Sequence, residues 1–365
     1  MRVHAFCLAA LLAGMAVDSQ AYTLAPEGTQ IERKLTRLSE SQVRKAFGAF
    51  AAWGVRKFGK PVHEEITNLI AGCVAGEDEC ANPDNDPGVA YILAGVRWND
   101  DPPFRFESGY GKYTGCKPEQ TIRLVTQPEC WARVFKDGKE RASRGERLVG
   151  LGVPLMLRSH FGDFQFLHAM ATADGVRAVD TQQLIMMWAE FTWDVATQRI
   201  KAGALVRQQK IDGLAKLFDR HEWQVQHLFG LGNPWIQQHA NYLADVAFGS
   251  LLHMVEDSYS VAHVDRYPPV AGERCAGVDL SAPGAIRQFR SYVHQDSDKH
   301  AEADTRDALS AHLLSGKPDV VEVGQVLYRY REQRASWKQV KPYMTCLFRL
   351  SSDVMVAGPG DGYKP

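Results

Sequence analysis

The sequence has no excess of charge of either sign, because 42 lysine and arginine residues nearly balance 43 aspartate and glutamate residues. The resulting net charge of -1 provides no general attraction to nucleic acid or to an anionic membrane. It therefore argues against a high-affinity binder of duplex nucleic acid. It does not argue against an enzyme that holds a short substrate in a pocket.

Strand-like alternation is scarce, and no internal repeat or low-complexity tract is present. Apolar residues make up 45% of the chain, which is enough for a large core. In TQQLIMMWAEFTWDVATQRI they recur at the spacing of one helical face, which is typical of a core helix. These patterns predict an all-α protein with a single helical domain.

The N-terminus has the features of an export signal. Arg2 precedes the apolar run AFCLAALLAGMAV, and Ser19, Gln20 and Ala21 form a small-x-small cleavage pattern. The run is too short to span a membrane comfortably, so no transmembrane segment is expected. We therefore predict that residues 1–21 are a signal peptide cleaved near Ala21, and that the protein is secreted or periplasmic.

Motifs for reactive serine and cysteine chemistry are missing. The sequence has no Gly-x-Ser-x-Gly motif and no Cys-x-x-Cys pair, which argues against a serine nucleophile and against a thiolate metal site. Removal of the signal peptide takes Cys7 away and leaves six cysteines, which in an oxidising compartment predict three disulfides. Of the 15 possible pairings, we expect Cys73–Cys80, Cys116–Cys130 and Cys275–Cys346.

Beyond the signal peptide, residues 22–52 form a basic, helically patterned segment. This segment is interpreted either as an N-terminal helix or as a pro-segment removed later, and residues 53–365 are expected to form the main domain. Long irregular stretches are predicted at 76–90 and 101–150. Helices are predicted after Pro61 and at 153–173, 234–260, 285–294, 299–315 and 318–335.

The stretch LLHMVEDSYSVAH, residues 251–263, carries ionisable side chains inside a run that otherwise reads as a buried helix. Leaving a polar group buried without a partner costs about 2–7 kcal/mol, so hydrogen bonds or a metal have to compensate. His253 and Asp257 lie about 40° apart on one helical face, which suits a metal clamp. On a straight helix His263 would lie about 9 Å beyond Asp257. We therefore expect His263 to serve a second ion, with Asp257 as the shared ligand.

Three further stretches contain residues of the same ligand type. In YVHQDSDKHAEAD the His-x3-Asp spacing occurs twice, and the second pair is preferred because the following sequence continues as a helix. The two pairs are His294/Asp298 and His300/Asp304. The other two stretches are VRWNDDPPF, with Asp100 and Asp101, and RSHFGDFQFLHAMA, with His160, Asp163 and His168.

Together these motifs resemble the zinc-dependent phospholipase C and single-strand nuclease superfamily, and most closely its bacterial phospholipase C branch. HMVEDSYSVAH has the family's His-x3-Asp-x5-His spacing, and WND, HFGD and HAEAD resemble its other ligand motifs in the same order. In WGVRKFGKPVH, Trp53 and His63 resemble the family's N-terminal tryptophan and the histidine after it. That match would require removal of residues 22–52. The resemblance implies a helical domain enclosing about three zinc ions.

The resemblance also implies a ligand set. The first zinc would be held by Asp100, His160, His253 and Asp257, the second by His263, His300 and Asp304, and the third by Trp53, His63 and Asp257. His168 remains an alternative to His160, and His294/Asp298 to the second-zinc pair. Asp100 is expected, in addition, to orient the attacking water or accept its proton.

The implied activity is that of a secreted phospholipase C, which cuts phosphatidylcholine-type lipids at a membrane surface into diacylglycerol and a phosphorylated headgroup by metal-activated water. An extracellular zinc nuclease acting on single strands is the alternative, and a helical binding protein with structural zinc ions is a third reading. Aromatic residues near the motifs would suit acyl chains, a choline headgroup or the core; they are Phe104, Phe106, Phe161, Phe164 and Phe166. The sequence does not indicate an oligomeric state.

Overall fold

The computed structural model describes residues 24, 28–36, 61–73, 89–106, 116–150, 152–218, 222–315 and 317–364. The predicted signal peptide, Trp53 and most of the segment 22–52 lie outside these residues. The described residues are mainly helical, which confirms the predicted class, and their sheet consists of two short strands.

The elements run along the chain from α1 near the N-terminus to a short 3-10 helix near the C-terminus. The longer helices are α5 (Pro128–Ser143), α7 (Ala178–Ala196), α11 (Ala240–Asp257), α13 (Arg306–Ser315), α14 (Val320–Glu332) and α15 (Trp337–Leu347). The shorter helices are α1 (Gln30–Thr36), α3 (Val62–Ile70), α4 (Ala90–Val96), α6 (Leu155–Phe161), α8 (Leu214–Leu217), α9 (Val225–Phe229), α10 (Pro234–Gln237) and α12 (Ser297–Ala303). The 3-10 helices are η2 (Gln165–His168), η3 (Val206–Gln208) and η4 (Asp361–Tyr363), and the strands are β1 (Val264–Arg266) and β2 (Ile286–Phe289).

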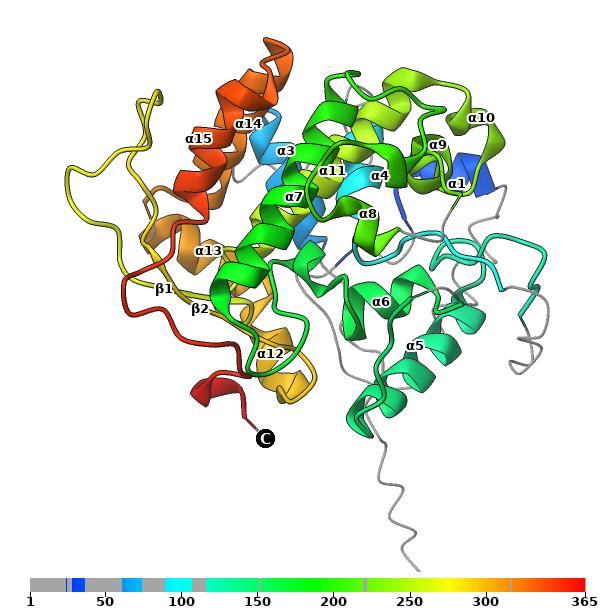
Figure 1. Ribbon diagram of the computed structural model, residues 1–365, viewed down its shortest axis with the longest axis horizontal. Coiled ribbons are helices and arrows are strands. Elements are labelled where there is room, and N and C mark those ends of the chain that lie inside the picture. The colour runs from blue at the N-terminus through cyan, green and yellow to red at the C-terminus, as the bar shows by residue number, and fades with distance from the viewer. Residues whose placement is uncertain are drawn as a thin grey trace, which may run out of the picture.

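Helix α11 lies at the centre and packs against both α7 and α4. Figure 1 shows α14 and α15 on one side of these helices, and α5 and α6 on the other. Trp188 and Phe191 on the predicted apolar face of α7 are fully buried, and so is Trp193, which lies outside that face. The centre of the molecule is therefore a helical core through which α11 runs.

Two glycines allow α4 and α11 to touch through their backbones. A Cβ atom on Gly95 would lie 2.2 Å from the carbonyl oxygen of Val246, and a Cβ atom on Gly249 would lie 2.2 Å from that of Ile92. Only glycine permits this approach. As a result, the turn that follows α4, which carries Asp100, is held close to the second half of α11.

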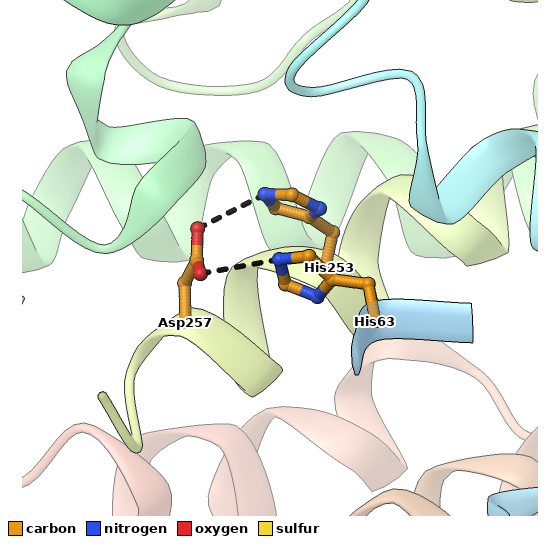
Figure 2. Close-up of side chains that lie close together, drawn as sticks. All are labelled: His63, His253 and Asp257. Atoms are coloured by element: carbon orange, nitrogen blue, oxygen red, sulfur yellow. Dashed lines mark ion pairs between the residues drawn. The ribbon is translucent and has the colours of Figure 1, made fainter. Parts of the chain in front are cut away.

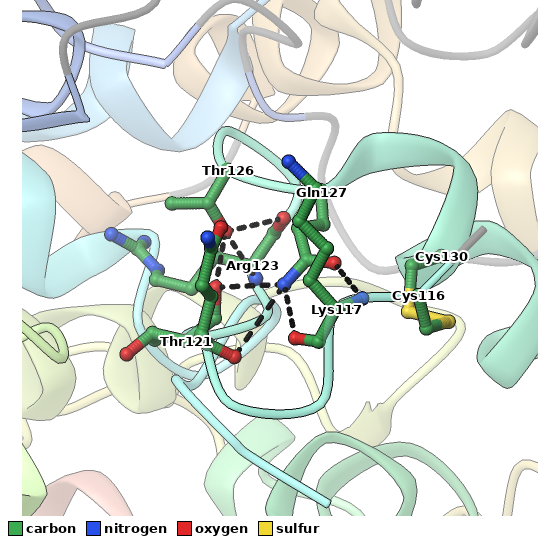
Figure 3. The surroundings of a disulfide bond; sticks show 8 residues. Cys116, Lys117, Thr121, Arg123, Thr126, Gln127 and Cys130 are labelled. Atoms are coloured by element: carbon green, nitrogen blue, oxygen red, sulfur yellow. Dashed lines mark hydrogen bonds between the residues drawn. A yellow bond between two sulfur atoms is a disulfide. The ribbon is translucent and has the colours of Figure 1, made fainter. Parts of the chain in front are cut away.

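Two predicted disulfides are confirmed. Cys116 pairs with Cys130, and Cys275 pairs with Cys346, with sequence separations of 14 and 71 residues. Near the first bond, the side chain of Gln127 accepts a hydrogen bond from the Lys117 amide, which closes the same loop (Figure 3). Cys73 is also disulfide-bonded, and its expected partner Cys80 lies outside the described residues.

Some local predictions were wrong. The expected loop at 101–150 contains α5, which begins with Pro128 at its first turn and buries an apolar face including Trp131 and Phe135. The expected helix at 153–173 is broken after α6 by the extended backbone at Gly162. The expected helix at 285–294 contains strand β2, which pairs antiparallel with β1. Short apolar runs do not distinguish a strand from a helix by periodicity alone.

The aromatic residues around the motifs belong to the core. Phe164 and Phe166 are fully buried, and Phe161 is 4% exposed. Phe104 and Phe106 pack edge to face within a second apolar cluster around α5 and α6. Of the three roles considered for these rings, contact with acyl chains, contact with a choline headgroup and core packing, the structure therefore shows core packing. None of the described helices combines the length and the apolar character needed to cross a membrane.

Candidate metal centre

The residues next to Asp100 in the turn after α4 fix its position by hydrogen bonds to other parts of the chain. The indole of Trp98 donates to the carbonyl oxygen of Leu228 at 2.9 Å, and the amide of Asn99 donates to that of Leu167 at 2.7 Å. Asp100 is 1% exposed, and within the described part of the chain neither of its carboxylate oxygens has a hydrogen-bond partner. A buried carboxylate without hydrogen bonds is the arrangement expected of a side chain that binds a cation.

His253 and Asp257 lie one turn apart at the end of α11, as the sequence predicted. His253 Nδ1 lies 2.7 Å from the carbonyl oxygen of Val96, so Nδ1 carries the proton and Nε2 carries a lone pair. That Nε2 faces Asp257 Oδ2 at 2.9 Å and His168 Nδ1 at 3.0 Å. The orientation of the ring therefore presents a ligand atom rather than a donor to Asp257.

His63 reaches the same carboxylate from α3. Its Nε2 lies 3.4 Å from Asp257 Oδ1, and its Nδ1 lies 2.5 Å from Glu256 Oε2. Figure 2 shows the two oxygens of Asp257 facing different imidazoles, those of His63 and His253. Thr67 donates to the other oxygen of Glu256 at 2.9 Å. Glu256 thus orients His63 in the way that a carboxylate behind a metal-bound histidine does.

The chain turns back directly after α11. The helix ends at Asp257, and the amides of Ser260 and His263 donate to the carbonyl oxygens of Asp257 and Ser260, each at 3.0 Å. This turn places His263 Nδ1 3.6 Å from Asp257 Oδ2, in place of the separation expected for a straight helix. The hydroxyl of Ser260 donates to Asp304 Oδ1 at 2.5 Å and so connects the turn to the late acidic ligand.

His263 and His300 face each other through atoms that both carry lone pairs. His263 Nδ1 lies 2.8 Å from the carbonyl oxygen of His168, and His300 Nδ1 lies 2.6 Å from Gln295 Oε1. Both Nδ1 atoms therefore donate, and the two Nε2 atoms lie 3.3 Å apart. Asp304 Oδ2 lies 3.1 Å from His300 Nε2. Two lone pairs and a carboxylate directed at one point require a proton or a metal ion between them.

The described residues contain three groups with ligand atoms close enough to hold an ion. Each group lies within 4.8 Å and all its members are buried. The groups are His63, His253 and Asp257; Asp100, His168 and His253; and His263, His300 and Asp304. His253 belongs to two groups, and Asp257 contacts side chains from all three.

The structure brings His168 to the centre in place of His160. His168 Nδ1 lies 2.8 Å from Asp257 Oδ2, whereas His160 Nε2 lies 2.9 Å from the backbone oxygen of Asp100. The reason is the path of the chain, because Asp163 pairs with Arg158 and η2 then carries His168 inward. The assignment of the first group therefore changes at this one position.

The rest of the expected set is placed as follows. His300 and Asp304 lie in a buried group, while the alternative His294 is exposed and pairs with Asp174 at 2.6 Å. Asp298 lies in the first turn of α12. Trp53, the remaining expected ligand, lies outside the described residues.

Electrostatics in the centre favour the ionised forms of Asp257 and Asp304. Burial alone would raise the pKa of Asp257, but the imidazoles of His263 and His253 hold it well below its usual value. Burial would likewise raise the pKa of Asp304, but nearby imidazoles lower it to about 2. Burial alone would lower the pKa of His263, and the carboxylates of Asp257 and Asp304 raise it to about 9. The centre is therefore set up to attract positive charge.

A small pocket opens onto the centre and has room for about one or two water molecules. It is lined by Ser159, His160, Gln165, His168, Met170, His263, Tyr292 and His300. Three of these residues belong to the metal-binding groups, so a molecule in the pocket would meet them directly. His160, which is in none of the three groups, is part of the pocket wall.

Comparisons of the chain with protein-family models, with curated proteins and with solved structures find no match. The fold and the centre together define a mainly helical protein with three buried groups of histidine and aspartate that can hold metal ions.

Sequence reasoning missed the residues that support the ligands. Glu256 directly precedes Asp257, but in a helix consecutive residues point in different directions, and nothing indicated that His63 would lie behind it. Gln295 is buried, donates to the backbone oxygens of Ala262 and Pro359, and accepts from His300. No spacing rule identifies such a glutamine.

Proposed function

We propose that the protein is a zinc-dependent phosphodiesterase of the phospholipase C type, which hydrolyses phosphatidylcholine-type lipids to diacylglycerol and a phosphorylated headgroup. The observation that carries the proposal is the convergence of three buried ligand groups, two of which reach a pocket through His168, His263 and His300. Nitrogen and oxygen donors with many histidines suit zinc.

The residues fit about three ions in the following way. Asp100, His168 and His253 would hold the first, His263, His300 and Asp304 the second, and His63 with Asp257 the third. When bound, such ions lower the pKa of a coordinated water towards about 7 and offset charge on phosphate oxygens. Each group has three protein ligands or fewer, which leaves a position for water or substrate.

The pocket is too small to enclose a whole lipid or its headgroup. It has room for about one or two water-sized groups, so phosphate oxygens would reach His263 and His300 while the rest of the lipid stays outside. The ring of Tyr292 lines the pocket and packs edge to face on His300, with centroids 5.1 Å apart. An aromatic face next to the phosphate site would attract a quaternary ammonium group.

The other residues have roles in holding the site. Gln295 keeps His300 Nε2 directed to the second group, and Glu256 does the same for His63. Asp100 does not line the pocket, as expected of a side chain that binds metal and does not contact substrate. Its expected role in orienting or deprotonating the attacking water remains a prediction. Burial raises the pKa of Asp100 to about 6, against the opposing attraction of His168.

The test is an assay of the purified exported protein. Metal content is measured by mass spectrometry, and hydrolysis is measured on phosphatidylcholine vesicles and on single-stranded DNA. We expect about three zinc ions per chain and release of diacylglycerol with phosphocholine. The variant His300→Asn should lose metal and activity, while His294→Asn, which alters the exposed histidine of the other His-x3-Asp pair, should keep both.

Other outcomes would replace the proposal. Cleavage of DNA without cleavage of lipid would make the protein a nuclease. Full zinc loading with no phosphodiesterase activity, together with unfolding on chelation, would make the metal centre structural.

A further inference from the structure

The described part of the N-terminal segment inserts a carboxylate into the interior of the protein. Glu32, on α1, is 1% exposed. Its Oε2 lies 2.8 Å from Arg97 Nε, and its Oε1 lies 2.6 Å from Arg123 Nη2. The amide of Thr29 donates to Glu32 Oε2 at 2.9 Å, and the amide of Glu32 donates to the Thr29 hydroxyl at 3.2 Å, so the start of α1 fixes the carboxylate.

The two arginines hold opposite ends of the turn that carries Asp100. Arg97 caps α4, and its carbonyl oxygen accepts from the amide of Asp101 at 2.9 Å. Arg123 Nε donates to the carbonyl oxygen of Asp101 at 3.0 Å, and its Nη2 lies 3.2 Å from Asp101 Oδ2. The Asp101 carboxylate also accepts from the amide of Leu124 at 2.7 Å. Asp100 thus stands between two residues that are fixed through guanidinium groups.

Removal of α1 would take away a buried negative charge that both guanidinium groups share. Arg97 would keep its pair with Glu64, at 2.6 Å, and Arg123 would keep Asp101. A buried guanidinium that loses one of its carboxylate partners is strongly destabilised. The position of the turn would then depend on fewer contacts. This is an argument against loss of the segment during maturation.

We infer that α1 remains part of the folded, active protein and that Glu32 is a positioning residue, which acts on Asp100 through Arg97 and Arg123. Of the two sequence interpretations of residues 22–52, this selects the retained N-terminal helix. Retention of α1 does not depend on the proposed activity. The effect on Asp100 rests on the proposed metal centre, and metal binding measures it without any substrate.

The first experiment compares Glu32→Gln with Glu332→Gln in the full chain. The substitution is the same, but Glu332 is exposed at the end of α14. We expect Glu32→Gln to lower the melting temperature and to weaken binding of one zinc ion roughly 10–100-fold, as the loss of a ligand-supporting group does. Glu332→Gln should change neither. Equal melting temperatures and equal zinc affinities for the two variants would overturn the inference.

A further measurement applies if Glu32→Gln does not fold. The active, natively exported protein should contain residues 28–36 by mass spectrometry, in one chain or as a fragment that co-elutes on gel filtration. An active protein without these residues would refute retention of α1.

Discussion

Four imidazoles of the centre have one nitrogen directed at an acceptor and the other directed inward; they are those of His63, His253, His263 and His300. The acceptor is a backbone oxygen for His253 and His263, and a side chain for His63 and His300. Since the acceptor fixes which nitrogen carries the proton, the ligand atoms are selected before any ion binds. This pattern is the one expected of histidines that can bind a metal ion.

The assignment of His168 to the first group, in place of His160, can be tested directly. His168→Asn should remove about one zinc ion per chain, because His168 Nδ1 lies in the first group. His160→Asn should keep the full metal content, since His160 contacts only the backbone oxygen of Asp100 among the atoms of that turn. Metal analysis of both variants after dialysis decides between them, and the opposite pattern would restore the assignment made from the sequence.

Gln295 provides a second test at this scale. Gln295→Leu removes the acceptor for His300 Nδ1, so the ring is free to turn and to change its tautomer. We expect zinc affinity at the second group to fall roughly 10–100-fold, with the other two groups unchanged. Competition with a fluorescent chelator measures this. The matched control is Gln333→Leu, at an exposed position after α14.

The sequence predicted ligand pairs well where both members lie on one helix. His253 with Asp257 and His300 with Asp304 follow from the pitch of a helix alone. The choice between His160 and His168 did not, because it depends on how the chain turns between α6 and η2. His263 belongs to a separate group, as expected, but it lies nearer to Asp257 than on a straight helix, since α11 stops at Asp257 and the chain folds back.

At the scale of elements, the contact of α4 with α11 determines how far Asp100 lies from His253 and Asp257. Asp100 follows α4, whereas His253 and Asp257 belong to α11. Gly95 and Gly249 allow the two backbones to touch, so the helices cannot come closer together and a larger side chain would push them apart. Long helices with a regular apolar face were found from the sequence, whereas β2 was mistaken for a helix because four residues carry no clear period.

Gly249→Ala should force α4 and α11 apart, because the new Cβ atom would lie 2.2 Å from the carbonyl oxygen of Ile92. We expect a loss of about 1–3 kcal/mol in the free energy of unfolding, together with weaker zinc binding. Urea denaturation and metal analysis measure the two effects. Gly203→Ala is the control, since no atom lies within 4 Å of its added Cβ. Unchanged stability in Gly249→Ala would show that the helices adjust freely.

Helix α1 should make stability depend on pH in a defined direction. Burial alone would raise the pKa of Glu32, but Arg123 and Arg97 hold it below its ordinary value of 4.5. A lowered pKa in the folded state stabilises the protein above the ordinary value, and this stabilisation is lost as the pH falls through the folded-state pKa. Asp101 and Glu64 are the other acidic groups around the two arginines.

The free energies of unfolding of the wild-type protein and of Glu32→Gln should therefore differ most near pH 7, by about 3 kcal/mol. The difference should shrink below pH 4.5, the ordinary pKa of the group. Urea denaturation at several pH values, with chelator present throughout, gives this difference directly. A difference that stays constant down to pH 3 would mean that Glu32 does not titrate as an ion pair.

At the scale of the whole molecule, the disulfides tie distant segments together. Cys275, between β1 and β2, is joined to Cys346 on α15, 71 residues later. The double variant Cys275→Ser/Cys346→Ser should lose about 2–4 kcal/mol of unfolding free energy, since a loop of this length gains much entropy when released. Urea denaturation of the variant and of the wild-type protein, both without reductant, measures this, and equal stabilities would contradict it.

The metal-binding groups draw on residues from His63 to Asp304, and His253 belongs to two of the groups. During synthesis, no group that uses His253 can assemble before α11 has been made, and the last one has to wait for α12. A nascent or truncated chain that stops short of residue 304 therefore carries no complete centre. If the proposed activity is correct, it cannot appear before residue 304 has been made.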